Sequence, residues 1–395
     1  MPIQIPVTQT GLEASIQAAA QRAGRNLKID LGVSSRSIGA LSQPLGKITG
    51  QADQFTKSME AANARVLAFG ASVGVLSAVA QGFSQLVAVT IQVEKNMADI
   101  NSVLQTNSTK LNKFKNDIFS VAKETGNSFQ TVSDAALELS RQGLGADDVL
   151  RRLKDSMILS RLSGLDAASA VEGLTAAVNS FSKEGVTTSD VLNKISNTAA
   201  KFSVSERDLI EGFKRSASVA QQAGVSLDEL GGIITAVQQK TARGGAVIGN
   251  AFKTIFTRIQ RPDSLAALQD IGAAVTDAQG GILPATKLIE NLAGKIKGLN
   301  DIQVASITEK IGGGFQVGPL IAALDDITGK TSIFKDATEA MATAGTEAYK
   351  RNTALNQTLA ASINMATINL QELANTLGEI GVTDSLKNIL SFFNS

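Results

Sequence analysis

The sequence predicts an all-α protein, and three observations support this class. Pro is scarce, with six residues in 395, while residues that favour helices are abundant. An apolar heptad pattern runs from residue 38 to residue 87. Beyond it, glycines recur at a spacing that suits one helix plus one turn. We therefore expect a long heptad-patterned helix, a central multi-helix bundle and a C-terminal amphipathic helix.

Residues 1–35 form an N-terminal segment with the one β signal in the chain. Residues 2–7 and 27–33 alternate apolar and polar side chains, so we expect at most two short strands there. A helix at about residues 11–25 would lie between them. The first ten residues lack the charged start and apolar run of a signal peptide.

Residues 36–92 predict a long helix with one apolar stripe. A heptad repeat of this length keeps the stripe facing one partner along a rod, so we expect a coiled-coil seam for self-association. The stripe steps alternately three and four residues along the chain. Its members are Ile38, Leu41, Leu45, Ile48, Ala52, Phe55, Met59, Ala62, Val66, Phe69, Val73, Leu76, Ala80, Phe83 and Val87.

The stretch from Val66 to Val93 carries no charge and is long enough to span a bilayer. It contains Gly70 and Gly74 at the spacing that lets membrane helices pack closely. Ser, Thr and Gln side chains dilute its hydrophobicity, however, and the heptad stripe crosses it without a change of phase. We favour a buried helix in an oligomer, with a membrane helix as the alternative.

Residues 93–330 predict the central bundle of short helices. Glycines mark its turns, at Gly126, Gly143, Gly164, Gly185 and Gly224. We expect three capping pairs at helix starts, namely Thr187 with Asp190, Ser203 with Glu206, and Ser226 with Glu229. The repeat is too irregular for a named solenoid.

Two glycine-rich segments are interpreted as hinges or turns between helices. They are Gly244, Gly245 and Gly249, and then Gly312, Gly313 and Gly314. The first looks like a phosphate-binding loop, but that loop needs Lys and Ser or Thr after its last glycine. Asn250 and Ala251 stand there instead, and no strand signal precedes the segment.

Residues 331–395 begin with a polar linker and predict a C-terminal helix with a second apolar seam. The seam is Ile363, Ala366, Leu370, Leu373, Leu377 and Ile380. Another apolar cluster lies close to the last residue, so we expect the segment to continue in a longer protein.

The composition argues against an enzyme. The chain has no Cys and no His, which removes disulfides, the usual zinc sites and imidazole-based catalysis. We expect no catalytic residues, no metal site and no cofactor. The acidic pairs Asp147-Asp148 and Asp228-Glu229 stand at helix starts and read as caps. Asp325-Asp326 reads as a solvated turn. A net charge of +1 gives no basis for sequence-specific nucleic-acid binding.

Several segments in a fixed order carry a family resemblance. They are residues 93–99, 135–143, 185–192, 223–231 and 261–272. The most specific segment is Arg243-Gly244-Gly245-Ala246-Val247-Ile248-Gly249-Asn250-Ala251-Phe252. By their order and spacing, these segments resemble the conserved helical domain of phage tail tape measure proteins, over about residues 93–330.

The resemblance implies a structural protein that sets the length of the tail tube during assembly and leaves ahead of the DNA during ejection. It implies a location in the host cytoplasm during assembly and then in the lumen of the tail tube. The implied partners are other copies of the chain, about three to six in a symmetric bundle, the tail tube protein and tail assembly chaperones. The host inner membrane is a further partner on infection. The alternative function is a membrane-active helical protein that inserts through residues 66–93.

Overall fold

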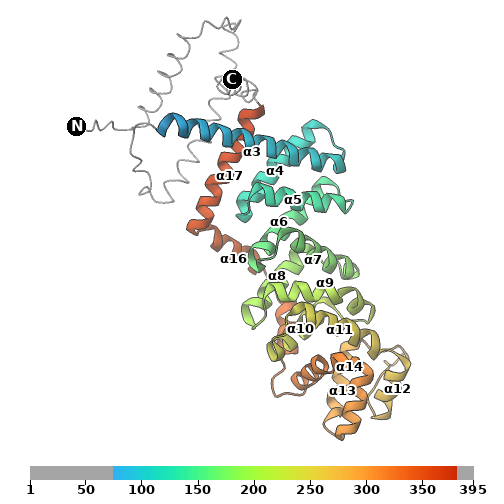
Figure 1. The fold of residues 1–395 in the computed structure, drawn as a ribbon. Helices are drawn as coiled ribbons and strands as arrows, with labels where there is room; N and C mark the ends of the chain where they lie inside the picture. The colour runs from blue at the N-terminus through green and yellow to red at the C-terminus, as the bar shows by residue number, and fades with distance from the viewer. Residues whose placement is uncertain (1–73, 380–395) are drawn as a thin grey trace, which may run out of the picture. The chain divides into compact units, whose positions relative to one another are not determined.

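The computed structural model describes residues 74–379, and this part of the chain is all-α (Figure 1). Within this range the structure has no strand, only an isolated bridge between Thr276 and Ile282. The predicted fold class is therefore confirmed. The strands expected at residues 2–7 and 27–33 lie outside the described residues, as does the heptad stripe from Ile38 to Val73.

The helices follow one another with short connections. They are α3 (Gly74–Leu104), α4 (Ser108–Thr125), α5 (Phe129–Arg141), α6 (Ala146–Ser163), α7 (Ala167–Ser180), α8 (Thr188–Lys201), α9 (Glu206–Gln222), α10 (Leu227–Thr241), α11 (Gly245–Ile259), α12 (Pro262–Asp270), α13 (Ala285–Ile296), α14 (Asp301–Ile327), α15 (Ile333–Ala342), α16 (Glu347–Asn356) and α17 (Leu359–Glu379). A 3-10 turn at Ser182–Glu184 lies between α7 and α8.

The five predicted turn glycines are confirmed. Each has a positive φ, between 65° and 79°, a conformation that glycine adopts without the steric cost of a Cβ. At Gly126 and Gly164 this conformation directly follows the last residue of a helix.

Two of the three predicted capping pairs are also confirmed. Thr187 with Asp190 starts α8, and Ser226 with Glu229 starts α10. The third pair, Ser203 with Glu206, is wrong. Because α9 begins at Glu206, the residue directly before it is Ser205, whose hydroxyl accepts the N–H of Asp208.

The buried apolar side chains form two clusters. The first joins α3 to α7 and is built around Ile100, Phe119, Phe129 and Met157. The second joins α6 to α16 and includes Phe213, Phe252 and Phe256 among many aliphatic side chains. Both clusters are formed by the apolar faces of short amphipathic helices. Burial of these faces supplies most of the stability of a helical bundle.

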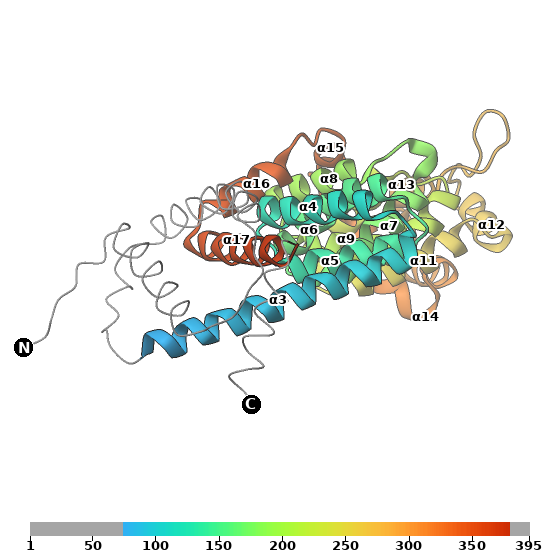
Figure 2. The same ribbon diagram turned by 90° about the horizontal axis from the view of Figure 1, so that it is seen from above.

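The last three helices return along the ones before them (Figures 1 and 2). Helix α15 packs on α10 and α8, α16 packs on α8 and α6, and α17 packs on α4 and α3. The chain order of α15 to α17 therefore runs opposite to that of the helices they cover. This return brings residues near 350 against residues near 155 and 195.

Candidate functional site

The N-terminal seam reaches the described residues only at its end. Leu76, Phe83 and Val87 fall within α3, which begins at Gly74, while the seam from Ile38 to Val73 and Gly70 lie outside. Helix α3 continues past residue 92 as a single helix of 31 residues to Leu104. No helix in the described range is both long enough and apolar enough to cross a membrane.

The C-terminal seam lies in α17, and part of it faces solvent. Ile363 is 54% exposed and Leu370 is 37% exposed, whereas Ala366 is buried and Leu373 is half-buried. The side chain of Leu377 and the whole of Ile380 lie outside the described part. The face that α17 packs against α3 and α4 carries Ala361, Ile368 and Asn375 instead.

Of the first three hinge or turn glycines, Gly244 alone lies between helices. It has a φ of +82° and donates its N–H to the side-chain oxygen of Gln238 at 2.8 Å. Gly245 and Gly249 lie inside α11, where the absence of a side chain lets α9 approach. A Cβ on Gly249 would lie 2.7 Å from the carbonyl oxygen of Gly212 in α9. These glycines thus form a close helix crossing rather than a flexible link.

The second glycine group lies at a kink in α14. Gly313 has φ +64° and ψ 176°, so the helix is interrupted there, between Gly312 and Gly314. Across the kink, the guanidinium of Arg258 donates to the carbonyl oxygen of Lys310 at 2.9 Å. Two residues past Gly313, Phe315 is 91% exposed.

The predicted acidic caps are mostly placed as expected. Asp147 and Asp148 lie in the first turn of α6, and Glu229 closes the capping box of α10. The interpretation of Asp325-Asp326 as a solvated turn is wrong for Asp326, which is 2% exposed. Its carboxylate accepts the backbone N–H of Phe334 at 2.9 Å, because the start of α15 folds back over the end of α14.

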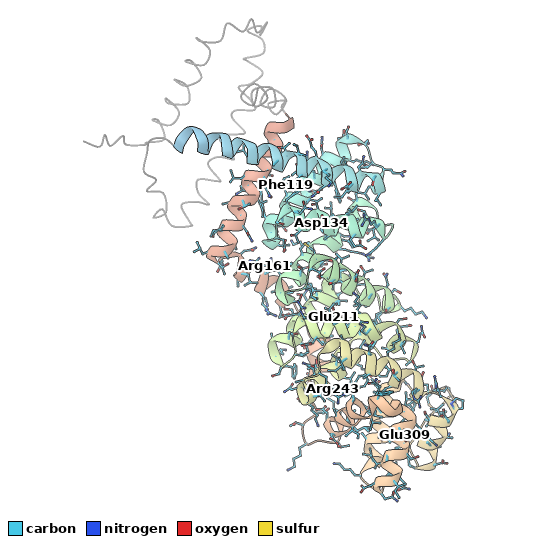
Figure 3. All side chains as sticks on the ribbon, viewed as in Figure 1. Phe119, Asp134, Arg161, Glu211, Arg243 and Glu309 are labelled. Carbon is cyan, nitrogen blue, oxygen red and sulfur yellow. The ribbon has the colours of Figure 1, made fainter. Side chains whose placement is uncertain are left out.

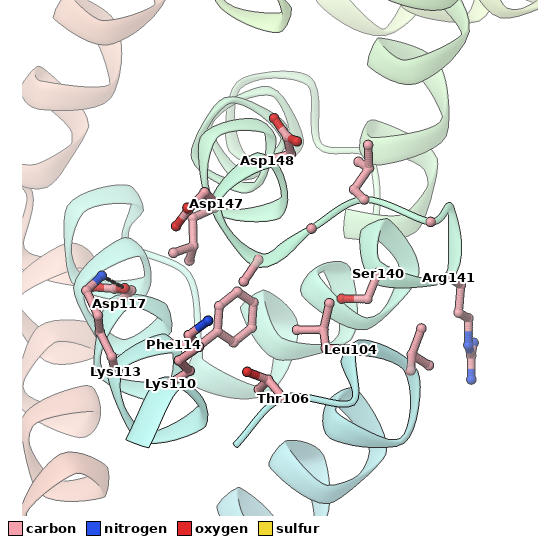
Figure 4. A pocket seen from close by; sticks show the side chains of 16 residues that line it. Leu104, Thr106, Lys110, Lys113, Phe114, Asp117, Ser140, Arg141, Asp147 and Asp148 are labelled. Atoms are coloured by element: carbon pink, nitrogen blue, oxygen red, sulfur yellow. Dashed lines mark hydrogen bonds and ion pairs between the residues drawn. The ribbon is translucent and has the colours of Figure 1, made fainter. Parts of the chain in front are cut away.

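A cavity of about 780 Å³ opens between the end of α3, α4, the end of α5 and the start of α6 (Figure 4). Apolar side chains such as Phe114 and Leu104 line it together with charged ones. Two of its carboxylates are engaged in ion pairs, Asp117 with Lys113 at 2.8 Å and Asp148 with Arg151. Across the described range, no group of three or more Asp and Glu residues is arranged to hold a metal ion.

The most concentrated set of buried polar groups lies where α16 meets α6 and α8. Asp155, 5% exposed, accepts the Thr188 hydroxyl at 2.5 Å and the Tyr349 hydroxyl. Tyr349 also contacts the Ser189 hydroxyl at 3.1 Å. Burial raises the pKa of Asp155, and burial together with the Asp155 carboxylate raises the pKa of Tyr349 to about 12.

Two further sets of polar contacts join α16 to the helices that it covers. Arg351 pairs with Glu206, whose side chain is 7% exposed, and donates to the Ser196 hydroxyl at 3.0 Å. At the end of α16, Arg161 of α6 donates to Asn352 at 3.0 Å and to Asn356. Figure 3 shows Arg161 beside these returning helices. We call the groups of Asp155, Glu206 and Arg161, with their partners on α16, the polar interface.

The sequence interpretation missed the polar interface. One signal for it exists: Asp155, Ser196 and Asn197 occupy positions that the helical period assigns to the buried side of α6 and α8. A polar residue at such a position needs a hydrogen-bond partner, which here comes from α15 and α16. The sequence near each of these residues does not indicate which distant helix supplies the partner.

A comparison with known families finds a match. The sequence model of the family described as phage-related minor tail protein matches residues 115–313, about half of the chain. The match begins inside α4 and ends at Gly313, the residue at which α14 kinks. Helices α3 and α15 to α17 lie outside it. No solved structure shows a significant match to the chain.

Proposed function

Because the chain belongs to the family of phage-related minor tail proteins, we propose that it is the tape measure protein of a phage tail. Family membership makes it a structural, virion-associated protein of the tail. The proposal adds a finer role: several copies lie in the tail tube, and the length of their helical part sets the number of tube rings.

The continuity of α3 is the observation that carries this proposal. Helix α3 contains the last members of the heptad stripe and runs without interruption to Leu104. Its final turns, with Met97 and Ile100 buried, pack on α5 in the first core cluster. A heptad rod that leads directly into a folded domain has a defined end, and a helix has a fixed rise of about 1.5 Å per residue. Both properties suit a ruler.

Self-association through the seams would keep the rod in register. The exposed Ile363 and Leu370 offer α17 an apolar face of heptad spacing that the described helices leave open to solvent. We propose that copies pair through the N-terminal seam and that the α17 face extends this contact. The tail tube protein and tail assembly chaperones are the further partners of a ruler, and release ahead of the DNA would follow from its place in the lumen.

The test is tail length in particles that carry an in-frame deletion of residues 45–86. This deletion removes six whole heptads, so the seam stays in phase. A helical ruler predicts tails shorter by about 60 Å, at about 1.5 Å per residue. A tandem duplication of the same residues is the matched control and should lengthen the tail by the same amount.

Unchanged tail length in both variants would refute a ruler in this segment. If such particles also failed to deliver DNA, residues 45–86 would instead act in ejection or in passage through the inner membrane.

A further inference from the structure

The return segment is attached to the other helices in two different ways. Helix α15 is held by apolar packing, with Phe334 and Met341 buried. Gly231 of α10 leaves space for the Met341 side chain, and Gly232 leaves space for Thr338 and the backbone carbonyl of Phe334. A Cβ on Gly232 would lie 2.1 Å from the Thr338 hydroxyl oxygen. This close fit makes α15 part of the second core cluster.

Helix α16 is held mainly by hydrogen bonds and ion pairs. Within Glu347–Asn356, only Ala348 and Asn352 are buried, and the partly buried Tyr349 ring packs beside Ala348 at the edge of the second core cluster. The polar contacts across to the other helices are those of the polar interface and a bond from the Ala348 N–H to the side-chain oxygen of Asn193 at 3.2 Å. They also include two bonds to the carbonyl oxygen of Glu124, from the side-chain amides of Asn352 and Asn356, at 2.8 Å each.

Helix α17 is likewise attached with few large apolar side chains. It contributes one large apolar side chain, Ile368, to the first core cluster. The other buried apolar residues of its described part are the small Ala361 and Ala366. Two polar contacts add to this: an ion pair between Lys123 and Glu372 at 2.5 Å, with both side chains about one quarter exposed, and a bond from the Asn364 amide to the carbonyl oxygen of Gly126 at 3.2 Å.

We propose that α16 and α17, residues 347–379, form a strap that opens as one unit while α3 to α15 stay folded. Opening replaces the strap's polar contacts with water on both sides, and the net loss per contact is small. The carboxylates of Asp155 and Glu206 also regain hydration. Detaching α15 would instead expose apolar core. The strap therefore turns at residues 343–346, between α15 and α16.

This inference does not depend on the tape measure role. It gives the protein a second conformation, in which the faces of α3, α4, α6 and α8 that the strap covers become accessible. The strap lies outside the residues that the family match covers.

Hydrogen exchange of the full chain tests the strap. We expect amides of α16 and α17 to exchange together, about tenfold or more faster than amides of α9 to α11. Arg351→Ala removes the partner of Glu206, the first residue of α9, and should speed exchange of the strap by about tenfold, without changing that of α10 and α11. Lys350→Ala is the control, because Lys350 is exposed and its ion pair with Glu347 lies within the strap.

A second readout uses the single Tyr of a chain that lacks Trp. Tyr349 fluorescence reports on the strap alone, and circular dichroism reports on all helices. We expect the Tyr349 transition at lower denaturant concentration than the loss of helix. Strap amides that exchange no faster than those of α9 to α11 in the wild-type chain would overturn the proposal, as would a single coincident transition.

Discussion

A Cβ atom on Gly245 would lie 1.7 Å from the backbone carbonyl oxygen of Asp208. The two residues are also joined by a hydrogen bond of 2.9 Å from the Gly245 N–H to the Asp208 side chain. The same carboxylate closes the capping box of α9 with Ser205. Asp208 thus holds the first turns of α9 and α11 together, and glycine is the residue that this distance allows.

The first prediction concerns Gly245→Ala. The added methyl group would meet backbone rather than a movable side chain, so α9 and α11 must separate. We expect the free energy of unfolding to fall by about 2 kcal/mol or more. Gly294→Ala is the control, since nothing lies within 4 Å of its Cβ position in α13. That change should stabilise the protein by about 0.5 to 1 kcal/mol. Denaturant unfolding measures the free energy of unfolding of both variants. Equal changes in the two variants would contradict a close contact between α9 and α11 at Gly245.

The second prediction compares neighbouring acids. Asp326 is buried and accepts the N–H groups of Ile333 and Phe334 at the start of α15, whereas Asp325 is exposed. We expect Asp326→Ala to lower the free energy of unfolding by about 1 to 3 kcal/mol, because buried donors lose their acceptor. Asp325→Ala should change it by less than about 0.5 kcal/mol. A similar change in the free energy of unfolding for both variants would contradict a stabilising role for the hydrogen bonds that Asp326 accepts at the start of α15.

The third prediction concerns pH and Asp155. Burial raises the pKa of this carboxyl in the folded protein above its ordinary value of 3.8. The associated stability is present at low pH and is lost as pH rises through the folded pKa. We therefore expect the stability of the wild type, relative to Asp155→Asn, to increase as pH falls from 7 towards 4.

The comparison with Asp155→Asn isolates this group. Asp166 has a lowered pKa through its bonds to the N–H and hydroxyl of Ser169, and its contribution has the opposite sign. That contribution is present in both proteins and cancels in the difference. Urea unfolding at several pH values gives the result. A difference that is constant with pH, or that falls with acidification, would contradict it.

The ends of several helices could be predicted from the sequence. A helix end depends on its own few residues, so the turn glycines and two capping boxes could be recognised from their neighbours. The Ser203 pair failed because two serines stand close together, and the start of α9 decides which one caps it. The kink at Gly313 also matched a glycine-rich segment in the sequence.

The candidate site could not be read in the same way. Asp155 and Tyr349 are separated by 194 positions, and their contact depends on the return of α15 to α17. The heptad pattern of α17 likewise predicted which positions are apolar but not which side of the helix is buried. Ile368, outside the predicted seam, is the residue that packs into the first core cluster, while Ile363 and Leu370 face solvent. Which face of a helix is buried depends on its neighbours.

That exposed face supports a last prediction. Replacing both Ile363 and Leu370 with Ser removes exposed apolar area, so the loss of monomer stability should be small, about 0.5 kcal/mol or less. If the face pairs with other copies, the double variant should weaken self-association by about tenfold or more, because apolar seam residues supply most of the contact energy. Sedimentation over a range of concentrations measures the change. Thr367→Ala, at an exposed polar position whose hydroxyl bonds only within the same helix, is the matched control. Unchanged association in the Ser variant, with weakening in the Ala control, would place the contact on the polar side of α17 and remove the C-terminal seam from the assembly.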